Sequence, residues 1–149
     1  LGVALRKSKN NDAAIATYRK GLEAHPNDPE LLNNLGVALR KARRYEESIT
    51  AHERAVDADP YDPASARNLA IAYRGAKRYK DAIPIYIKAL ELGDGGPPEL
   101  LFDLGSCYEK LGNTDMAIKT FERYIRAVKK SDPAAAERAE RAVENVKKR

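Results

Sequence analysis

The chain has 149 residues, of which 43% are hydrophobic and 33% are charged, and its formal net charge is +5. This length corresponds to one ordinary domain, and the apolar fraction is too high for a disordered chain. A single cysteine excludes a disulfide framework within the chain, and only two histidines argue against a built-in zinc site. Since no apolar run approaches the ~20 residues of a membrane helix, we expect a soluble domain without membrane insertion, in a compartment that the sequence leaves open.

The sequence repeats itself with a period of 34 or 35 residues. LGVALRK at residues 1–7 recurs unchanged at residues 35–41, and related heptads follow at residues 69–75 (LAIAYRG) and 104–110 (LGSCYEK). The segments after each heptad also align. A period of this length indicates a solenoid, in which each repeat packs only on its neighbours.

The repeats share one numbering if the LG pair of each heptad is placed at positions 7 and 8. Complete repeats then span residues 29–62, 63–97 and 98–131, and residues 1–28 form a partial first repeat that enters at position 7. The chain begins inside the first helix of a repeat and does not start with Met. We therefore expect it to be part of a longer protein.

Each repeat is predicted to form a pair of helices. Apolar residues at positions 4, 7, 8 and 11 follow the spacing of one helical face, and positions 20, 24 and 27 repeat the pattern in the second half. Small residues at positions 8 and 20 allow two helix backbones to approach closely, and rings at positions 11 and 24 fill the space beside them. Pro26 and Pro60 end second helices, and Pro29, Pro63 and Pro98 lie near the next helix start, where proline is tolerated.

These positions resemble the tetratricopeptide repeat family, whose repeats carry a large apolar residue, LG, Tyr, Ala, an aromatic residue and Pro in this order. The resemblance covers about residues 1–131 and holds in register in four consecutive repeats. It implies an all-α fold, a right-handed α-solenoid of antiparallel helix pairs. The departures are Ala70 at position 8, His52 at position 24, Asp94 and Lys129 in place of proline at position 32, and one extra residue in the linker GDGGPPE at residues 93–99.

Residues 132–149 do not begin another repeat. Asp132 and Pro133 together form a helix start signal. One narrow apolar stripe follows, made of Ala135, Ala139, Ala142, Val143 and Val146. We expect a C-terminal capping helix that covers the last open core face, as the end of a solenoid requires.

No catalytic constellation is apparent. His52 occupies the ring-filling position 24 and His25 lies in a linker, so we interpret His52 as a packing residue. Cys107 occupies position 10, where the other repeats have alanine, and is interpreted as a small packing residue. The glycines of residues 93–96 follow no strand and precede no GKS or GKT, so they do not form a phosphate loop. We therefore expect a protein that is not an enzyme, with no catalytic residue, no cofactor and no metal.

The candidate binding surface is the face of each first helix that points away from the packing stripe, at positions 2, 5, 9, 12 and 13, with position 6 at its margin. In the family this face lines the concave groove, which solenoids use for binding. Position 12 holds Arg6, Arg40 and Arg74, position 9 holds Val3, Val37 and Ile71, and position 6 holds Asn34 and Asn68. Phe102 extends the apolar stripe in the fourth repeat. The residues predicted to bind a partner are Asn34, Val37, Arg40, Arg67, Asn68, Ile71, Arg74 and Phe102.

Each pattern also has a structural interpretation. The arginines hold carboxylates or complement the helix dipole as solvated charges. The Val and Ile stripe meets a partner or is covered in part by neighbouring repeats. The asparagines resemble the ladder with which some superhelical members, including the O-GlcNAc transferase type, hold a peptide main chain, or they make caps and inter-repeat hydrogen bonds. The carboxylate-clamp pattern of the family, Lys at position 5 with Asn at position 9, is not met.

The leading hypothesis is a non-catalytic scaffold that binds a peptide segment or partner protein carrying acidic and aliphatic residues in the concave groove. An alternative is a substrate-docking or regulatory arm of a larger enzyme or assembly. Nucleic-acid binding is disfavoured, because the tyrosines mostly occupy packing positions and the basic residues are interleaved with acids. Contact through the second helices and self-association both stay open.

Overall fold

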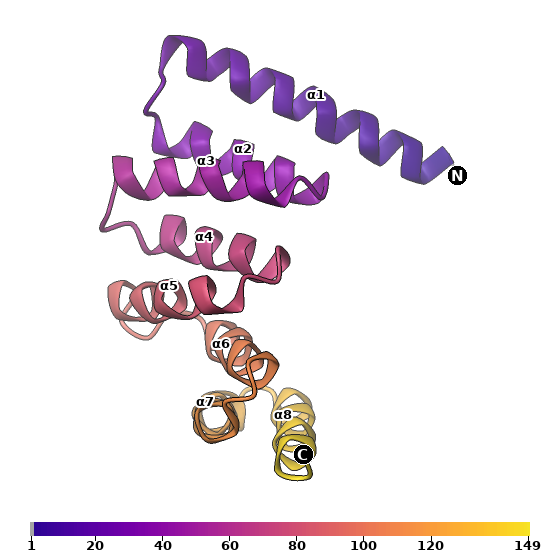
Figure 1. The fold of residues 1–149 in the computed structure, drawn as a ribbon, viewed down its shortest axis with the longest axis vertical. Helices are drawn as coiled ribbons and strands as arrows, with labels where there is room; N and C mark the ends of the chain where they lie inside the picture. Colours follow the sequence, from indigo (N-terminus) through magenta and orange to yellow (C-terminus); the bar gives the residue numbers. More distant parts are fainter. Residues whose placement is uncertain (1) are drawn as a thin grey trace. The chain divides into compact units, whose positions relative to one another are not determined.

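The computed structural model describes the backbone of residues 2–149 and the side chains of residue 3 and residues 7–149. Every regular element in that part of the chain is an α-helix, as the repeat pattern predicts (Figure 1). The helices are α1 (Gly2–Ala24), α2 (Pro29–Lys41), α3 (Tyr45–Ala58), α4 (Pro63–Gly75), α5 (Tyr79–Leu92), α6 (Glu99–Lys110), α7 (Thr114–Val128) and α8 (Pro133–Lys147). They form two compact units, Leu1–Arg78 and Tyr79–Arg149. None of the helices in residues 2–149 combines the length and the hydropathy that crossing a membrane requires.

Aspartate side chains define the starts of α2, α4 and α8. Asp28, Asp62 and Asp132 each accept hydrogen bonds from backbone amides two or three residues further on. Proline occupies the first helical position after each of them, where its missing N–H is not needed. The helix starts predicted at Pro29 and Pro63 are therefore confirmed.

The turn between the two helices of each complete repeat uses one residue in the left-handed region. Arg43 and Lys77 both have φ of 59°, and Gly112 has φ of 73°. All three stand at position 15 of their repeats. Position 15 of each complete repeat therefore requires a positive φ. Glycine adopts it without strain, whereas arginine and lysine adopt it at a cost in free energy.

The core of the first compact unit is built from leucines on α2. Leu32, Leu35 and Leu39, at positions 4, 7 and 11, are buried together with Ile15 and Leu22 of α1. Helix α2 packs against both α1 and α3, while α4 packs against α3 and also contacts α2. The predicted packing stripe of the second repeat is thus confirmed.

The helix pair expected in the first repeat is wrong, because residues 2–24 form one continuous helix of 23 residues. Figure 1 shows α1 unbroken, with its amino-terminal end extending past α2 and α3. The turn position of this repeat holds Lys9, in a segment without glycine. Continuing the helix through residues 8–11 avoids the cost of a left-handed lysine, a cost that the second and third repeats accept at Arg43 and Lys77.

The second compact unit is centred on Phe121 of α7, which is 1% exposed. Helix α7 packs against both α6 and α8. The predicted capping segment is a helix, and its stripe is buried at Ala135, Ala139, Val143 and Val146. Val143 and Val146 join Phe121 in one apolar cluster.

Candidate functional site

Seven of the eight residues predicted to bind a partner lie on two helices that contact each other, α2 and α4. All seven are half-buried. We name this surface the α2–α4 face and define it by Asn34, Val37, Arg40, Arg67, Asn68, Ile71 and Arg74. Half-burial of Val37 and Ile71 means that neighbouring side chains cover them in part, while one side stays open to solvent.

The eighth residue, Phe102, lies in the second compact unit. Its ring centroid is 5.3 Å from the ring centroid of Phe121 and equally far from that of Tyr124, and it packs against the core of α7 and α8. These contacts give Phe102 a packing role between α6 and α7, and its role in partner binding stays a prediction. The side chain of Arg6 lies outside the described residues, so the arginine ladder is described only at Arg40 and Arg74.

The two asparagine amides of the α2–α4 face are available to a ligand. The side-chain amides of Asn34 and Asn68 make no hydrogen bond to another residue in the described part of the chain. Each amide retains a donor and an acceptor, the pair of groups that a peptide bond also offers. Three of the seven residues are arginines and none is acidic, so the face attracts carboxylates.

A buried polar chain beneath this face links three helices, and the sequence analysis missed it. His52 Nδ1 of α3 lies 3.0 Å from Asn33 Oδ1 of α2. Asn33 Nδ2 donates to Ser65 Oγ of α4 at 2.7 Å, and Ser65 Oγ donates to the capping carboxylate of Asp62 at 2.6 Å. Because the Asn33 amide nitrogen is used for Ser65, its oxygen must accept, which places the proton of His52 on Nδ1. Asn33 is therefore a positioning residue for α2 and α4, although it stands at a groove position.

In the sequence, the only indication of these hydrogen bonds is His52 itself, which replaces the aromatic residue expected at position 24. Burial lowers the pKa of His52 to about 4, and the positive charge of Arg40 acts in the same direction. The imidazole is therefore neutral at pH 7. Its second nitrogen, Nε2, is buried and has no partner among the described atoms.

The same series of hydrogen bonds ends at Asp62, the N-cap residue of α4. Burial alone would raise the pKa of the Asp62 carboxyl, but hydrogen bonds from the Ser65 hydroxyl and from the Ala64 and Ser65 amides, with Arg67 nearby, bring it below its ordinary value. The carboxylate is therefore charged at neutral pH. It fixes the start of α4, and with it the position of Arg67 on the face.

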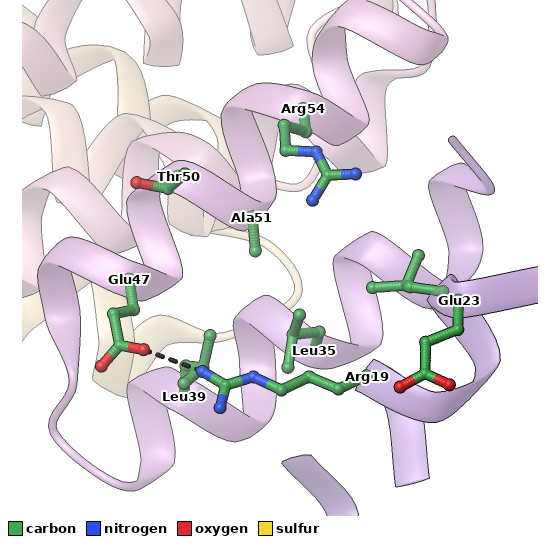
Figure 2. Close-up of a pocket in the computed structure, with 9 residues that line it drawn as sticks. Arg19, Glu23, Leu35, Leu39, Glu47, Thr50, Ala51 and Arg54 are labelled. Carbon is green, nitrogen blue, oxygen red and sulfur yellow. Dashed lines mark hydrogen bonds and ion pairs between the residues drawn. The ribbon is translucent and has the colours of Figure 1, made fainter. Parts of the chain in front are cut away.

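A pocket of about 410 Å³ lies on the other side of α2, between α1, α2 and α3 (Figure 2). Its apolar lining comes from Leu22, Leu35, Leu39 and Ala51. Its polar lining comes from Arg19, Glu23, Glu47, Thr50 and Arg54. Figure 2 shows the ion pair across it, in which Arg19 Nη2 lies 2.9 Å from Glu47 Oε2.

Several charged side chains that line this pocket already have partners within the chain. Arg44 also donates to Glu47, through Nε at 2.7 Å, and this hydrogen bond keeps the pKa of Glu47 below its ordinary value. Arg54 donates to the Pro26 carbonyl at 2.6 Å. Arg19, Glu47 and Arg54 of the pocket therefore already have partners within the chain. Within the described residues, no group of three or more His, Cys, Asp or Glu side chains is arranged to hold a metal ion.

Comparison with known families places the repeat pattern in a defined group. Two family models match the chain, over residues 1–63 and residues 61–130, and both are described as tetratricopeptide repeat. No curated protein sequence matches the chain.

Solved structures share the fold at low sequence identity. The crystal structure of MamA is 22% identical, with a TM-score of 0.75 over 99% of this chain and 93% of that chain. PcrH in complex with the chaperone binding region of PopD is 22% identical, with a TM-score of 0.71 over 79% of this chain and 90% of that chain. The Yersinia enterocolitica type III secretion translocator chaperone SycD is 18% identical, with a TM-score of 0.71 over 79% and 82%. At these identities the likeness shows the fold alone.

Proposed function

We propose that this chain, which belongs to the tetratricopeptide repeat family over residues 1–130, binds a peptide segment of a partner protein on its α2–α4 face. One observation carries the proposal. Two adjacent helices present an apolar pair, Val37 and Ile71, together with three arginines, and the amides of Asn34 and Asn68 on the same face make no hydrogen bond within the described chain.

The chemistry of the face specifies the ligand. Val37 and Ile71 favour aliphatic side chains, because burial of apolar area against them is stabilising. Arg40, Arg67 and Arg74 favour Asp or Glu on either side of those residues, since a guanidinium binds a carboxylate with two parallel hydrogen bonds. The amides of the two asparagines suit an extended peptide main chain. We therefore expect an extended segment in which Leu, Val or Ile is flanked by acids.

The comparisons support the class of ligand and leave the partner's identity open. PcrH, which shares the fold, was solved with the chaperone binding region of PopD, a segment of another protein. The fold is therefore able to hold a protein segment. The specificity of this chain rests on its own α2–α4 residues.

The test is a binding titration with short synthetic peptides, followed by fluorescence anisotropy. One peptide carries Leu and Val flanked by Asp and Glu, and its control carries Lys in place of every acid. We expect the acidic peptide to bind and the basic one not to bind. The variant Asn34→Ala, Asn68→Ala, Arg74→Glu should lose most of the affinity.

A matched control variant carries the same kinds of change away from the face. Asn27→Ala, Arg123→Glu and Asn145→Ala replace three exposed residues and should retain the affinity of the wild type. Circular dichroism and thermal unfolding must show that all three proteins are folded. Equal affinity of the wild type and the α2–α4 variant for the acidic peptide would contradict the proposal.

A further inference from the structure

The α2–α4 face holds three pairs of residues at equivalent positions of consecutive repeats. Positions 6, 9 and 12 carry an asparagine, an aliphatic residue and an arginine in both the second and the third repeat. All six side chains are half-buried. The pairs are Asn34 with Asn68, Val37 with Ile71, and Arg40 with Arg74. Each of the three chemistries is therefore offered to a ligand twice, once by α2 and once by α4.

The interval between the members of a pair is set by the packing of α2 and α4. These two helices run in the same direction, with α3 returning between them along the chain (Figure 1), and they contact each other directly. The axes of helices in contact lie about 8–10 Å apart. Asparagine, aliphatic and arginine groups therefore all recur across the face at about this one interval.

An extended peptide covers this interval in three residues. Its rise is about 3.1–3.4 Å per residue, so residues i and i+3 lie about 9–10 Å apart. Residues i and i+2 lie about 6–7 Å apart, and residues i and i+4 lie about 12–14 Å apart. A spacing of three residues thus allows one ligand to place an aliphatic side chain on Val37 and another on Ile71.

The direction of the side chains selects one kind of extended conformation. In a β-strand, residues i and i+3 point to opposite faces, whereas in a polyproline II helix three residues complete a turn and both point the same way. A polyproline II helix also has no internal hydrogen bonds. Its main-chain groups are therefore free to bond to the amides of Asn34 and Asn68, which make no hydrogen bond within the described chain.

We infer that the α2–α4 face binds a segment in the polyproline II conformation with aliphatic residues at i and i+3, an inference that rests on the proposed function. Val37 and Ile71 contact the two aliphatic side chains. Arg40 and Arg74 bind acids that follow the same period of three on a neighbouring edge of the ligand. The ligand thus has a defined spacing as well as an acidic and aliphatic composition.

The first test compares three peptides of identical composition by fluorescence anisotropy. Each peptide has two leucines, each followed by a glutamate, and the leucines are two, three or four residues apart. The peptide with the three-residue spacing should bind about tenfold more tightly than the other two, because they bury only one leucine. Equal affinity of all three would overturn the spacing and leave the proposed function standing. Binding by none of them would contradict the proposed function as well.

The second test removes one of the two apolar contacts from the protein. Val37→Ala and Ile71→Ala should each reduce the preference for the three-residue spacing from about tenfold to about twofold or less. Val56→Ala, at a half-buried position of α3, is the matched control and should keep the preference. Circular dichroism checks the fold of all three variants. A preference that survives both Val37→Ala and Ile71→Ala would overturn the assignment of the two contacts.

The third test addresses the conformation of the bound peptide. In the peptide with the three-residue spacing, the residue before the second leucine is replaced by proline or by glycine. The proline peptide should bind about threefold more tightly than the glycine peptide, because proline favours the polyproline II conformation before binding. Equal or weaker binding of the proline peptide would overturn this conformation.

Discussion

His52 is a polar residue in a position that the repeat pattern reserves for an aromatic ring. His52 Nδ1 is hydrogen-bonded to the Asn33 amide, and the same amide donates to the Ser65 hydroxyl. The polar side chain of His52 is therefore connected to polar partners on two other helices. Its Nε2 stays buried without a partner in the described structure, and an unmatched buried polar atom lowers stability. The periodicity predicted that His52 is a packing residue. It did not predict the chain of hydrogen bonds, which depends on side-chain orientations across three helices.

Stability should therefore fall as the pH is lowered. The pKa of His52 is about 4 in the folded protein against 6.5 ordinarily, so the unfolded chain binds the proton more tightly. The contribution of His52 is full above pH 6.5 and is lost progressively as the pH falls towards 4. Between pH 7 and pH 5 the loss amounts to about 2 kcal/mol of unfolding free energy.

Urea unfolding at a series of pH values measures this loss. Between pH 7 and pH 5 the unfolding free energy of His52→Phe should fall by about 2 kcal/mol less than that of the wild type. His25→Gln, at an exposed loop position, serves as the matched control and should keep the wild-type slope. Parallel slopes for the wild type and His52→Phe would show that this imidazole does not titrate as the burial implies.

The left-handed turn residues give a second prediction at this scale. Arg43→Gly should raise the unfolding free energy by about 0.5–1 kcal/mol, because glycine adopts φ of 59° without the strain of a side chain. Gly112→Ala should lower it by about 1 kcal/mol for the same reason. No atom lies within 4 Å of a Cβ at Gly112, so backbone strain alone is tested. Denaturant unfolding of both variants measures the effect, and a destabilised Arg43→Gly would contradict it.

At the scale of the helices, the sequence predicted most elements because their determinants are local. The aspartate and proline pairs mark the starts of α2, α4 and α8, and the apolar spacing identified the buried face of α2. Helix α1 could not be predicted in the same way. Whether residues 8–11 turn or continue depends on the balance between the cost of a left-handed Lys9 and the apolar area that a returning helix buries, and the apolar spacing carries no information on that balance.

Close helix crossings yield a prediction about glycine. Gly36→Ala should lower the unfolding free energy by about 2–3 kcal/mol, because its Cβ would lie 2.4 Å from the buried ring of His52. Gly21→Ala is the matched control, since its Cβ meets only the end of the flexible Leu31 side chain at 3.1 Å. This change should be neutral or stabilising by up to about 1 kcal/mol, because alanine is the better helix former. Equal effects of the two substitutions in thermal or urea unfolding would refute the tight crossing.

At the scale of the whole molecule, the repeat period predicted an array of helix pairs, and the family matches over residues 1–130 confirm its kind. The period did not predict the division into Leu1–Arg78 and Tyr79–Arg149, which falls inside the third repeat. Nor did it predict the pocket between α1, α2 and α3. Repeats with similar sequences differ in how neighbouring helices pack on them, and this packing depends on the folded structure and not on the repeat sequence alone.

The charge of the α2–α4 face predicts how binding responds to salt. Raising NaCl from about 0.05 M to about 0.5 M should lower the affinity for the acidic peptide by about tenfold, mostly through slower association. Arg40→Gln should reduce this dependence, since it removes one of the three arginines of the face. Stopped-flow association rates at several salt concentrations provide the measurement. Rates that do not change with salt would show that the arginines take no part in capture.

The most direct test of the α2–α4 face is quantitative capture from the source lysate, read by mass spectrometry. The wild type is compared with the Asn34→Ala, Asn68→Ala, Arg74→Glu variant and with the Asn27→Ala, Arg123→Glu, Asn145→Ala control. We predict that a protein with an acidic and aliphatic segment is captured by the wild type and the control and lost by the α2–α4 variant. Capture of the same partners by all three proteins would contradict the account and place the binding surface elsewhere on the chain.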